Sequence, residues 1–176
     1  MLWNEYFMML ARMTASRSTC LAPSVGAVIV KNKQVLAMGY NGAPSGSRHC
    51  TDQGFCYESL SSCSASKTLL SRAVHAEASA IGQAAQHGIS TLGSSIYVTL
   101  EPYISCLKLV IAAGIRQIYY ETSLITDENA ELRDSFVVEG LINLQQVVLP
   151  PLSVQKLSAL YPIFPDSSFE LLVNPQ

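Results

Sequence analysis

The sequence predicts a layered α/β domain, and two observations lead to this prediction. Strand-sized apolar runs alternate with helix-sized segments along the chain, which is typical of layers of helices packed on a sheet. Hydrophobic residues make up 49% of the 176 residues, and charged residues only 14%, which excludes a mainly disordered chain. A chain of this length is large enough to bury a core within a single domain, so we expect one domain over residues 1–176.

The first third of the chain predicts a helix, a hairpin and a long loop. Apolar side chains at helical spacing predict a helix over residues 3–16. Two short apolar runs, at 25–30 and 34–40, predict a pair of antiparallel strands. Residues 41–67 are rich in Gly, Ser, Pro and Cys and lack periodicity. A loop of this length is either functional or held by something other than a core.

Helices and strands alternate through the rest of the chain. The Ala-rich segment at 72–87, which lacks proline, predicts a helix that begins close to His75, and Gly88 ends it. Similar patterns predict the remaining elements: a strand at 95–100, a helix at 104–113, a strand at 116–120, a helix at 128–139, a strand at 144–149 and a short helix at 152–160.

Charge and hydropathy indicate the environment of the protein. Eleven Lys and Arg against 13 Asp and Glu give a net charge of -2, so no basic face for nucleic acid is expected. No apolar run approaches the roughly 18 residues of a membrane span, and the N-terminus lacks the basic start of a signal peptide. We therefore expect a cytoplasmic protein with no membrane partner. So little charge also predicts a homo-oligomer, because large exposed apolar patches are rare on monomers.

The cysteines favour thiol or metal chemistry over disulfides. An odd number of them in a chain that can fold without covalent staples makes a complete disulfide framework improbable. The five are Cys20, Cys50, Cys56, Cys63 and Cys106.

The sharpest local signal joins two predicted helix starts. His75-Ala76-Glu77 begins one helix, and Pro102-Tyr103-Ile104-Ser105-Cys106 begins the next. The pattern nearly matches the zinc deaminase signature, H-x-E with a later P-C-x-x-C, in which His and Cys hold zinc and Glu carries protons. Helix N-termini also favour thiolates and other anions. The pattern predicts His75 and Cys106 as zinc ligands and Glu77 as the catalytic acid and base.

Flanking segments extend the match, and on these residues the chain over roughly 3–121 resembles the cytidine and deoxycytidylate deaminase superfamily, most closely its deoxycytidylate (dCMP) deaminase branch. The resemblance implies a three-layer α/β/α fold with a mixed five-stranded sheet, with 122–176 as a C-terminal extension. It also implies hydrolysis of dCMP to dUMP and ammonia, activation by dCTP, inhibition by dTTP and a hexamer. The matching segments are Trp3 to Phe7, Arg17-Ser18-Thr19-Cys20, Val25 to Val30, Gly39-Tyr40-Asn41-Gly42 with Pro44 and Gly46, His49-Cys50, Tyr97-Val98-Thr99 and Ala113-Gly114-Ile115.

The resemblance also implies substrate contacts. Asn41 would hydrogen-bond the sugar, and Arg17 is a partner for the phosphate because a guanidinium binds a dianion through two hydrogen bonds. Tyr120, at a strand end, is a candidate for lining the pocket. Each residue has a plainer interpretation: a surface arginine, turn chemistry in Asn41-Gly42, and a core aromatic.

A second metal site is also implied. The resemblance assigns Cys20 and Cys50 to a structural zinc ion, and Cys56 and Cys63 are our proposed remaining ligands, because the long loop needs a clamp. The alternative is buried, unpaired thiols, which are common. His49 is expected to be a loop residue and not a ligand. Mg²⁺ bound together with a nucleotide effector is the remaining cofactor that the resemblance leads us to expect.

One residue departs from the family motif, because Tyr103 stands where the first metal-ligating Cys is expected. A phenol has a reference pKa about 1.5 units above that of a thiol, so it binds zinc less readily. Three interpretations stand: zinc-bound phenolate, zinc held weakly by His75, Cys106 and waters, or a site filled by Tyr103. The expected function is zinc-dependent deamination of dCMP. The alternative is a catalytically impaired homologue that acts as a nucleotide-binding regulatory subunit.

Overall fold

A five-stranded mixed sheet forms the centre of the fold in the computed structural model, which describes residues 1–54, 72–124 and 130–151. The strand order is β2-β1-β3-β4-β5. Strand β1 is antiparallel to both neighbours, whereas β3, β4 and β5 are parallel. The strands are β1 (Gly26–Lys31), β2 (Gln34–Tyr40), β3 (Ser95–Leu100), β4 (Gln117–Thr122) and β5 (Asn143–Gln146).

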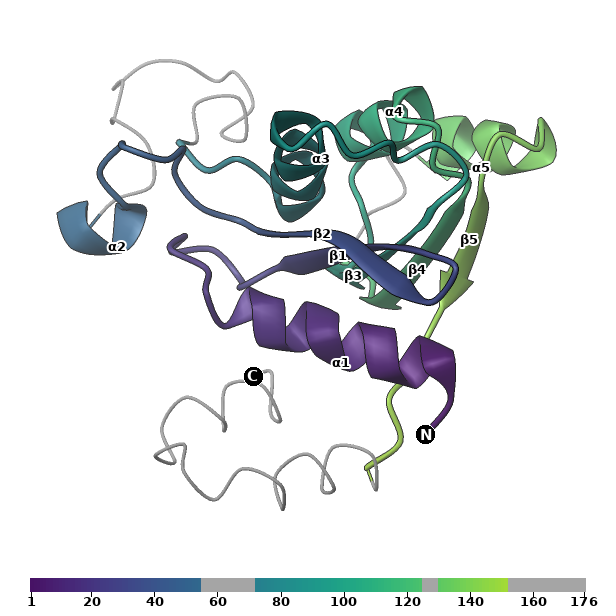
Figure 1. Ribbon diagram of the computed structural model, residues 1–176, viewed down its shortest axis with the longest axis horizontal. Coiled ribbons are helices and arrows are strands. Elements are labelled where there is room, and N and C mark those ends of the chain that lie inside the picture. The colour runs from purple at the N-terminus through teal and green to yellow at the C-terminus, as the bar shows by residue number, and fades with distance from the viewer. Residues whose placement is uncertain (55–71, 125–129, 152–176) are drawn as a thin grey trace.

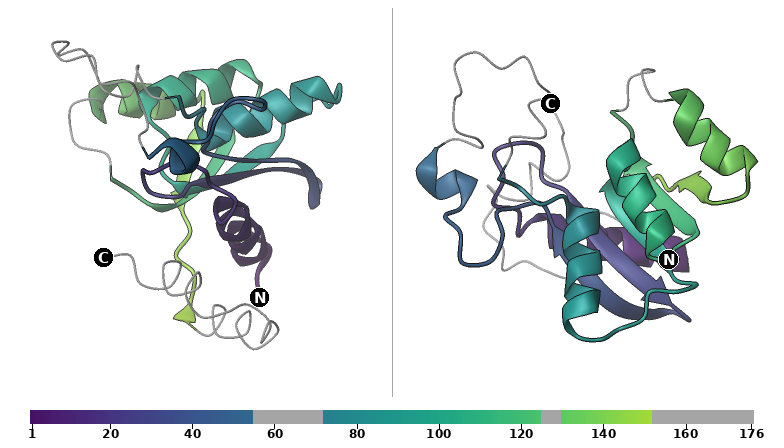
Figure 2. Two further views of the ribbon diagram at one scale, coloured as in Figure 1. Left: turned by 90° about the vertical axis from the view of Figure 1, so that its left-hand side faces the viewer. Right: turned by 90° about the horizontal axis from the view of Figure 1, so that it is seen from above.

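Helices cover both faces of this sheet, which confirms the predicted three-layer architecture (Figure 1). Among the described helices, only α1 (Trp3–Ala15) covers one of the two faces. Three helices lie in a row on the opposite face, as the view from above shows (Figure 2). They are α3 (Ala76–Gln86), α4 (Ile104–Ala112) and α5 (Ala130–Val138). The short helix α2 (Cys50–Gln53) lies to one side of the layers.

The central strand β1 serves two cores, one on each face of the sheet. Successive side chains of a strand point to opposite faces. Ile29 therefore packs on the α3 and α4 side, and Val28 packs with Phe7 and Met8 of α1. Burial on both faces explains why this strand is a continuous apolar run in the sequence. Among the described helices, none is long and apolar enough to cross a membrane.

Two glycines set the distance between the helices and the sheet. A Cβ atom on Gly26 would lie 2.1 Å from the carbonyl oxygen of Ala11 in α1. A Cβ atom on Gly39 would lie 2.3 Å from the backbone nitrogen of Ala80 in α3. Both obstacles are helix backbone, which cannot turn aside as a side chain can. Only glycine therefore allows the two helices to pack this closely on opposite faces of the sheet.

The observed elements differ from the predicted ones mainly at their ends. Helix α3 begins at Ala76, close to His75 as predicted, and just before it Val74 forms an antiparallel bridge with Gly42. Strand β5 ends at Gln146, and beyond it Val147 and Leu149 pack in the core beneath α1. The predicted loop at 41–67 contains α2, which the sequence pattern did not indicate. The predicted helix at 152–160 lies outside the described residues.

We predict that Gly39→Ala lowers the free energy of unfolding by about 1–3 kcal/mol, because α3 must move away from β2. Gly82→Ala is the matched control, since Gly82 lies in the same helix and a Cβ atom there meets nothing within 4 Å. Its helix should gain about 0.5–1 kcal/mol. Urea unfolding of the two variants measures both effects. Equal stability of the two proteins would contradict the close packing at Gly39.

Candidate active site

Three possible metal ligands meet where helices α3 and α4 begin. His75 is the N-cap residue of α3, and Glu77 lies in the first turn of that helix. Cys106 lies in the first turn of α4. Their donor atoms all lie within 4.8 Å of one another, and His75 Nδ1 is 3.3 Å from Cys106 Sγ. In residues 1–54, 72–124 and 130–151 no other set of three His, Cys, Asp or Glu donors is this close.

The interior of this cluster favours the uncharged form of every member. Burial raises the pKa of Glu77 to about 7, although hydrogen bonds to its backbone and to Cys106 oppose the rise. Burial also raises the pKa of the Cys106 thiol far above its usual range, and the neighbouring Glu77 carboxylate raises it further. For His75, burial lowers the pKa. A divalent cation at the centre would reverse this preference, because it stabilises a thiolate and a carboxylate.

The donor set fits zinc. Imidazole nitrogen, thiolate sulfur and carboxylate oxygen are the three kinds of atom that bind zinc in proteins. Glu77 and Cys106 lie in the first turns of their helices, where the helix dipole stabilises negative charge. His75 and Glu77 come from the start of α3 and Cys106 from the start of α4, and both helices pack on the same face of the sheet.

Tyr103 borders this cluster. It is the N-cap residue of α4, and its side chain is 42% exposed. Its ring centroid lies 5.8 Å from that of His75, with the two planes inclined at 52°. The sequence prediction that Tyr103 belongs to the metal site is therefore consistent with its place, but the contact recorded is with the imidazole ring. Its role as a ligand stays a prediction.

Asn41 has a structural role in the described fold. Its side chain is buried, and Oδ1 accepts hydrogen bonds from Ser18 Oγ at 2.7 Å and from the Val25 backbone at 2.8 Å. The side-chain nitrogen donates to the Pro23 carbonyl at 3.0 Å. These bonds tie the segment after α1 to the end of β2. The predicted contact of Asn41 with a sugar stays a prediction, since most of its hydrogen-bonding capacity is already used.

The other two substrate candidates are Arg17 and Tyr120, and Tyr120 lies inside β4, not at a strand end as predicted. Arg17 is exposed in the turn that follows α1. Tyr120 is half-buried on β4, and burial raises its pKa, as does the nearby charge of Glu101. Its neighbour Tyr119 points to the opposite face and stacks on Tyr97 at 4.5 Å. Tyr120 thus lies on the α3 and α4 side of the sheet, the side that carries the metal-ligand cluster.

The segments that carry Cys20 and Cys50 lie side by side, because the Thr51 backbone donates a hydrogen bond to the Thr19 carbonyl at 3.3 Å. Cys50 is fully buried at the start of α2. Cys56 and Cys63 lie outside the described residues. His49 is the N-cap residue of α2, and its Nδ1 is buried without a hydrogen-bond partner in the part of the chain that the structure describes.

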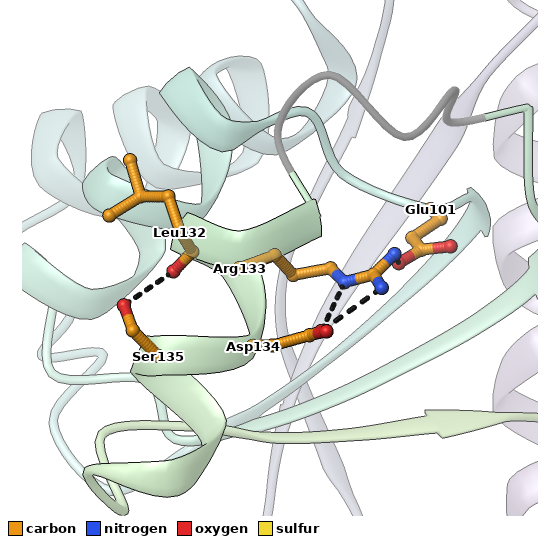
Figure 3. A network of polar contacts seen from close by, with 5 residues as sticks. All are labelled: Glu101, Leu132, Arg133, Asp134 and Ser135. Atoms are coloured by element: carbon orange, nitrogen blue, oxygen red, sulfur yellow. Dashed lines mark hydrogen bonds and ion pairs between the residues drawn. The ribbon is translucent and has the colours of Figure 1, made fainter.

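An ion pair beside the site was not predicted from the sequence. Glu101 follows β3 directly and is 4% exposed, and its carboxylate accepts a hydrogen bond from Arg133 of α5 (Figure 3). The only signal in the sequence is an acidic residue inside the strand-to-helix motif, next to Pro102. Nothing in the sequence indicates that residue 133 is its partner.

Comparison with known proteins agrees with this geometry. Residues 1–122 match the family model described as the cytidine and deoxycytidylate deaminase zinc-binding region. The chain is 37% identical over 158 residues to ComE operon protein 2 of Bacillus subtilis (strain 168), covering 89% of this chain and 79% of that protein. It is 39% identical over 124 residues to a deoxycytidylate deaminase of Mycobacterium phage D29, covering 67% and 93%.

A solved structure has the same fold. The dCMP deaminase of cyanophage S-TIM5, crystallised with dCMP and dUMP, superposes with a TM-score of 0.64 at 26% identity, over 81% of this chain and 95% of that one. The family match covers the sheet through β4 and both halves of the His75, Glu77 and Cys106 cluster. The chain belongs to the cytidine and deoxycytidylate deaminase family.

Proposed function

We propose that this protein catalyses the zinc-dependent hydrolysis of dCMP to dUMP and ammonia. The observation that carries the proposal is the cluster of His75, Glu77 and Cys106 at the starts of two adjacent helices. The relative from phage D29 is named a deoxycytidylate deaminase, and the structure from cyanophage S-TIM5 was determined with dCMP and dUMP. These likenesses support dCMP as the substrate.

His75 and Cys106 would hold the zinc ion, with the donor types and the proximity that such a site needs. A zinc ion held there would supply a Lewis acid that lowers the pKa of a water molecule toward neutrality, the chemistry needed for hydrolysis at C4 of cytosine. Cys106 must lose its proton when it binds the metal, so zinc uptake by this site releases protons.

Glu77 would transfer the protons of the reaction. It is 3% exposed, and burial raises its pKa to about 7, so at neutral pH it can both accept and donate a proton. We assign it to take a proton from the attacking water and to deliver protons to N3 of the base and to the leaving amine. Its position two residues after His75 keeps the carboxylate beside the metal ligands during both steps.

Substrate contacts are proposed for Arg17, Asn41 and Tyr120. The exposed side chain of Arg17 suits the phosphate, and Tyr120 lies on the same side of the sheet as the cluster. Control by dCTP and dTTP, Mg²⁺ bound with an effector, and assembly into a homo-oligomer such as a hexamer belong to the same proposal. Exposed apolar side chains on α1 support assembly, among them Trp3 at 52% exposed and Tyr6 at 43%.

We also propose a structural zinc site with Cys20, Cys50, Cys56 and Cys63 as ligands. The backbone contact between Thr19 and Thr51 supports it, because it brings two of the four cysteine-bearing segments together. The complete burial of Cys50 is consistent with a clamp of this kind.

A second candidate function rests on Tyr103. This residue stands where the zinc deaminase signature has a second thiolate, and its ring lies against His75. If the phenol occupies the metal position, the chain would bind nucleotides without turnover and act as a regulatory subunit. Binding of dCTP or dTTP without dUMP formation would distinguish this function from catalysis.

We expect purified, zinc-supplemented protein to convert dCMP to dUMP, as followed by ultraviolet absorbance with dCTP present. Glu77→Gln should lower the rate at least about 100-fold, because the proton carrier is lost. Glu131→Gln, at an exposed position on α5, is the control and should leave the rate unchanged. Zinc content is measured in all three proteins. A folded, zinc-loaded wild type that forms no dUMP would contradict the enzymatic function.

We expect Tyr103→Cys to raise both zinc retention and dCMP turnover, because a thiol is a readier zinc ligand than a phenol. Tyr103→Phe separates the interpretations: it loses zinc if the phenolate is a ligand and keeps zinc if it is not. Metal analysis after dialysis against a weak chelator gives the zinc content. Unchanged zinc content and unchanged rate in Tyr103→Cys would remove Tyr103 from the metal site.

We expect Glu77 to make the metal-free protein less stable as the pH rises from about 4.5 to about 7, against the opposite contribution of His75, whose pKa burial lowers. Over this range Glu77 ionises in the unfolded chain but keeps its proton in the buried site. Ionisation lowers the free energy of the unfolded state only, so the free energy of unfolding falls. Below the range both states hold the proton, and above it the penalty is constant. Glu77→Gln should lack this slope. Urea unfolding at several pH values measures it, and identical slopes in both proteins would exclude a raised pKa.

A further inference from the structure

Glu101 is a buried carboxylate at the junction between β3 and α4. Its side chain is 4% exposed, and its backbone N–H donates to the Thr122 carbonyl at 2.7 Å, at the end of β4. The next residue, Pro102, is fully buried, and Tyr103 then begins the helix that carries Cys106. The position of Glu101 therefore determines where this junction, and with it one metal ligand, lies on the sheet.

The cation that faces Glu101 comes from α5. Arg133 Nη1 lies 3.2 Å from Glu101 Oε1, and Nε and Nη2 each lie 3.0 Å from Oδ1 of Asp134 (Figure 3). The Asp134 side chain is 62% exposed, so the guanidinium reaches from a solvent-facing carboxylate to a buried one. Asp134 thus contacts two nitrogens of the same guanidinium whose third nitrogen faces Glu101.

This ion pair is a polar connection between α5 and the junction. None of the residues Ala130–Val138 is fully buried, and Phe136 is among the few that pack against the core. A buried carboxylate without its cation is costly, because it has lost its water and gained nothing in exchange. Glu101 and Arg133 therefore depend on each other: the helix neutralises the carboxylate, and the carboxylate anchors the helix.

The charges around Arg133 exclude a role as an anchor for the phosphate of a substrate. Two carboxylates face its guanidinium, so the group carries more negative than positive charge. An anion would be repelled here. The nearby hydroxyl of Tyr120, whose pKa is influenced by both Glu101 and Arg133, supplies no positive charge. The pair acts on the site through the position of the backbone and not through contact with a ligand.

We propose that Glu101 and Arg133 are a positioning pair that pre-forms the zinc site, holding the β3–α4 junction so that Cys106 stays within reach of His75. The proposal rests on the proposed function only in that the cluster binds zinc; it does not require dCMP to be the substrate. Partners outside the ligand shell commonly change metal affinity by 10- to 100-fold.

The test is the zinc affinity of the intact metal-free protein, measured by competition with a chromophoric chelator. The bound zinc that wild type holds and the Cys106→Ser variant lacks is attributed to this site. Arg133→Met should weaken zinc binding about 10-fold or more, and Arg133→Lys, which keeps the charge, should restore most of it. Arg116→Met is the matched control: Arg116 bonds to the Ile111 carbonyl at the opposite end of α4, so zinc affinity should not change.

A double variant separates position from stability. In Glu101→Gln with Arg133→Met the buried charge is gone, so the thermal midpoint should recover while zinc binding stays weak, because the anchor is still missing. This variant also serves if Arg133→Met alone fails to fold. Zinc affinity within twofold of wild type in a folded Arg133→Met protein or in the double variant would overturn the proposal. A protein that shows these zinc effects yet forms no dUMP would overturn the proposed function alone.

Discussion

The contact between helix α3 and the sheet at Gly39 is the constraint on which the site depends. His75 and Glu77 sit at the start of α3, so the height of this helix above β2 determines where two of the three donors lie. The third donor is placed independently, by β3 and the start of α4. The three donors meet because α3 and α4 both pack on the same face of one rigid sheet, whose core is packed tightly on this face.

Burial gives the cluster its chemical character. In this buried site each of the three groups prefers its neutral form. Cys106 must lose its proton to bind a metal, whereas a neutral carboxylic acid at Glu77 can donate one. A divalent cation would resolve this conflict for Cys106 by stabilising the thiolate. Burial gives Glu77 a pKa of about 7 in the metal-free site, and the cation would favour its carboxylate, the form that accepts a proton from water.

The sequence predicted those features that depend on neighbouring residues. The order of helices and strands followed from periodicity, and the two halves of the cluster followed from a short motif at two helix starts. Features that depend on distant partners were not predictable. The amide of Asn41 is used by the backbone of residues 23 and 25, and Glu101 pairs with Arg133 on a helix that no local pattern connects with it.

Tyr103 lies in the chain between the β3–α4 junction and Cys106, at the N-cap of α4. If Tyr103 replaces the first Cys of the zinc deaminase signature, the site would gain less electrostatic energy from the metal, and more of its affinity would come from donors that are already in place. Rigidity at the β3–α4 junction is then worth more here than in a site with a full ligand set. In our proposal the buried Glu101, which is costly unless paired, would supply that rigidity through Arg133, two residues before Tyr103 in the chain.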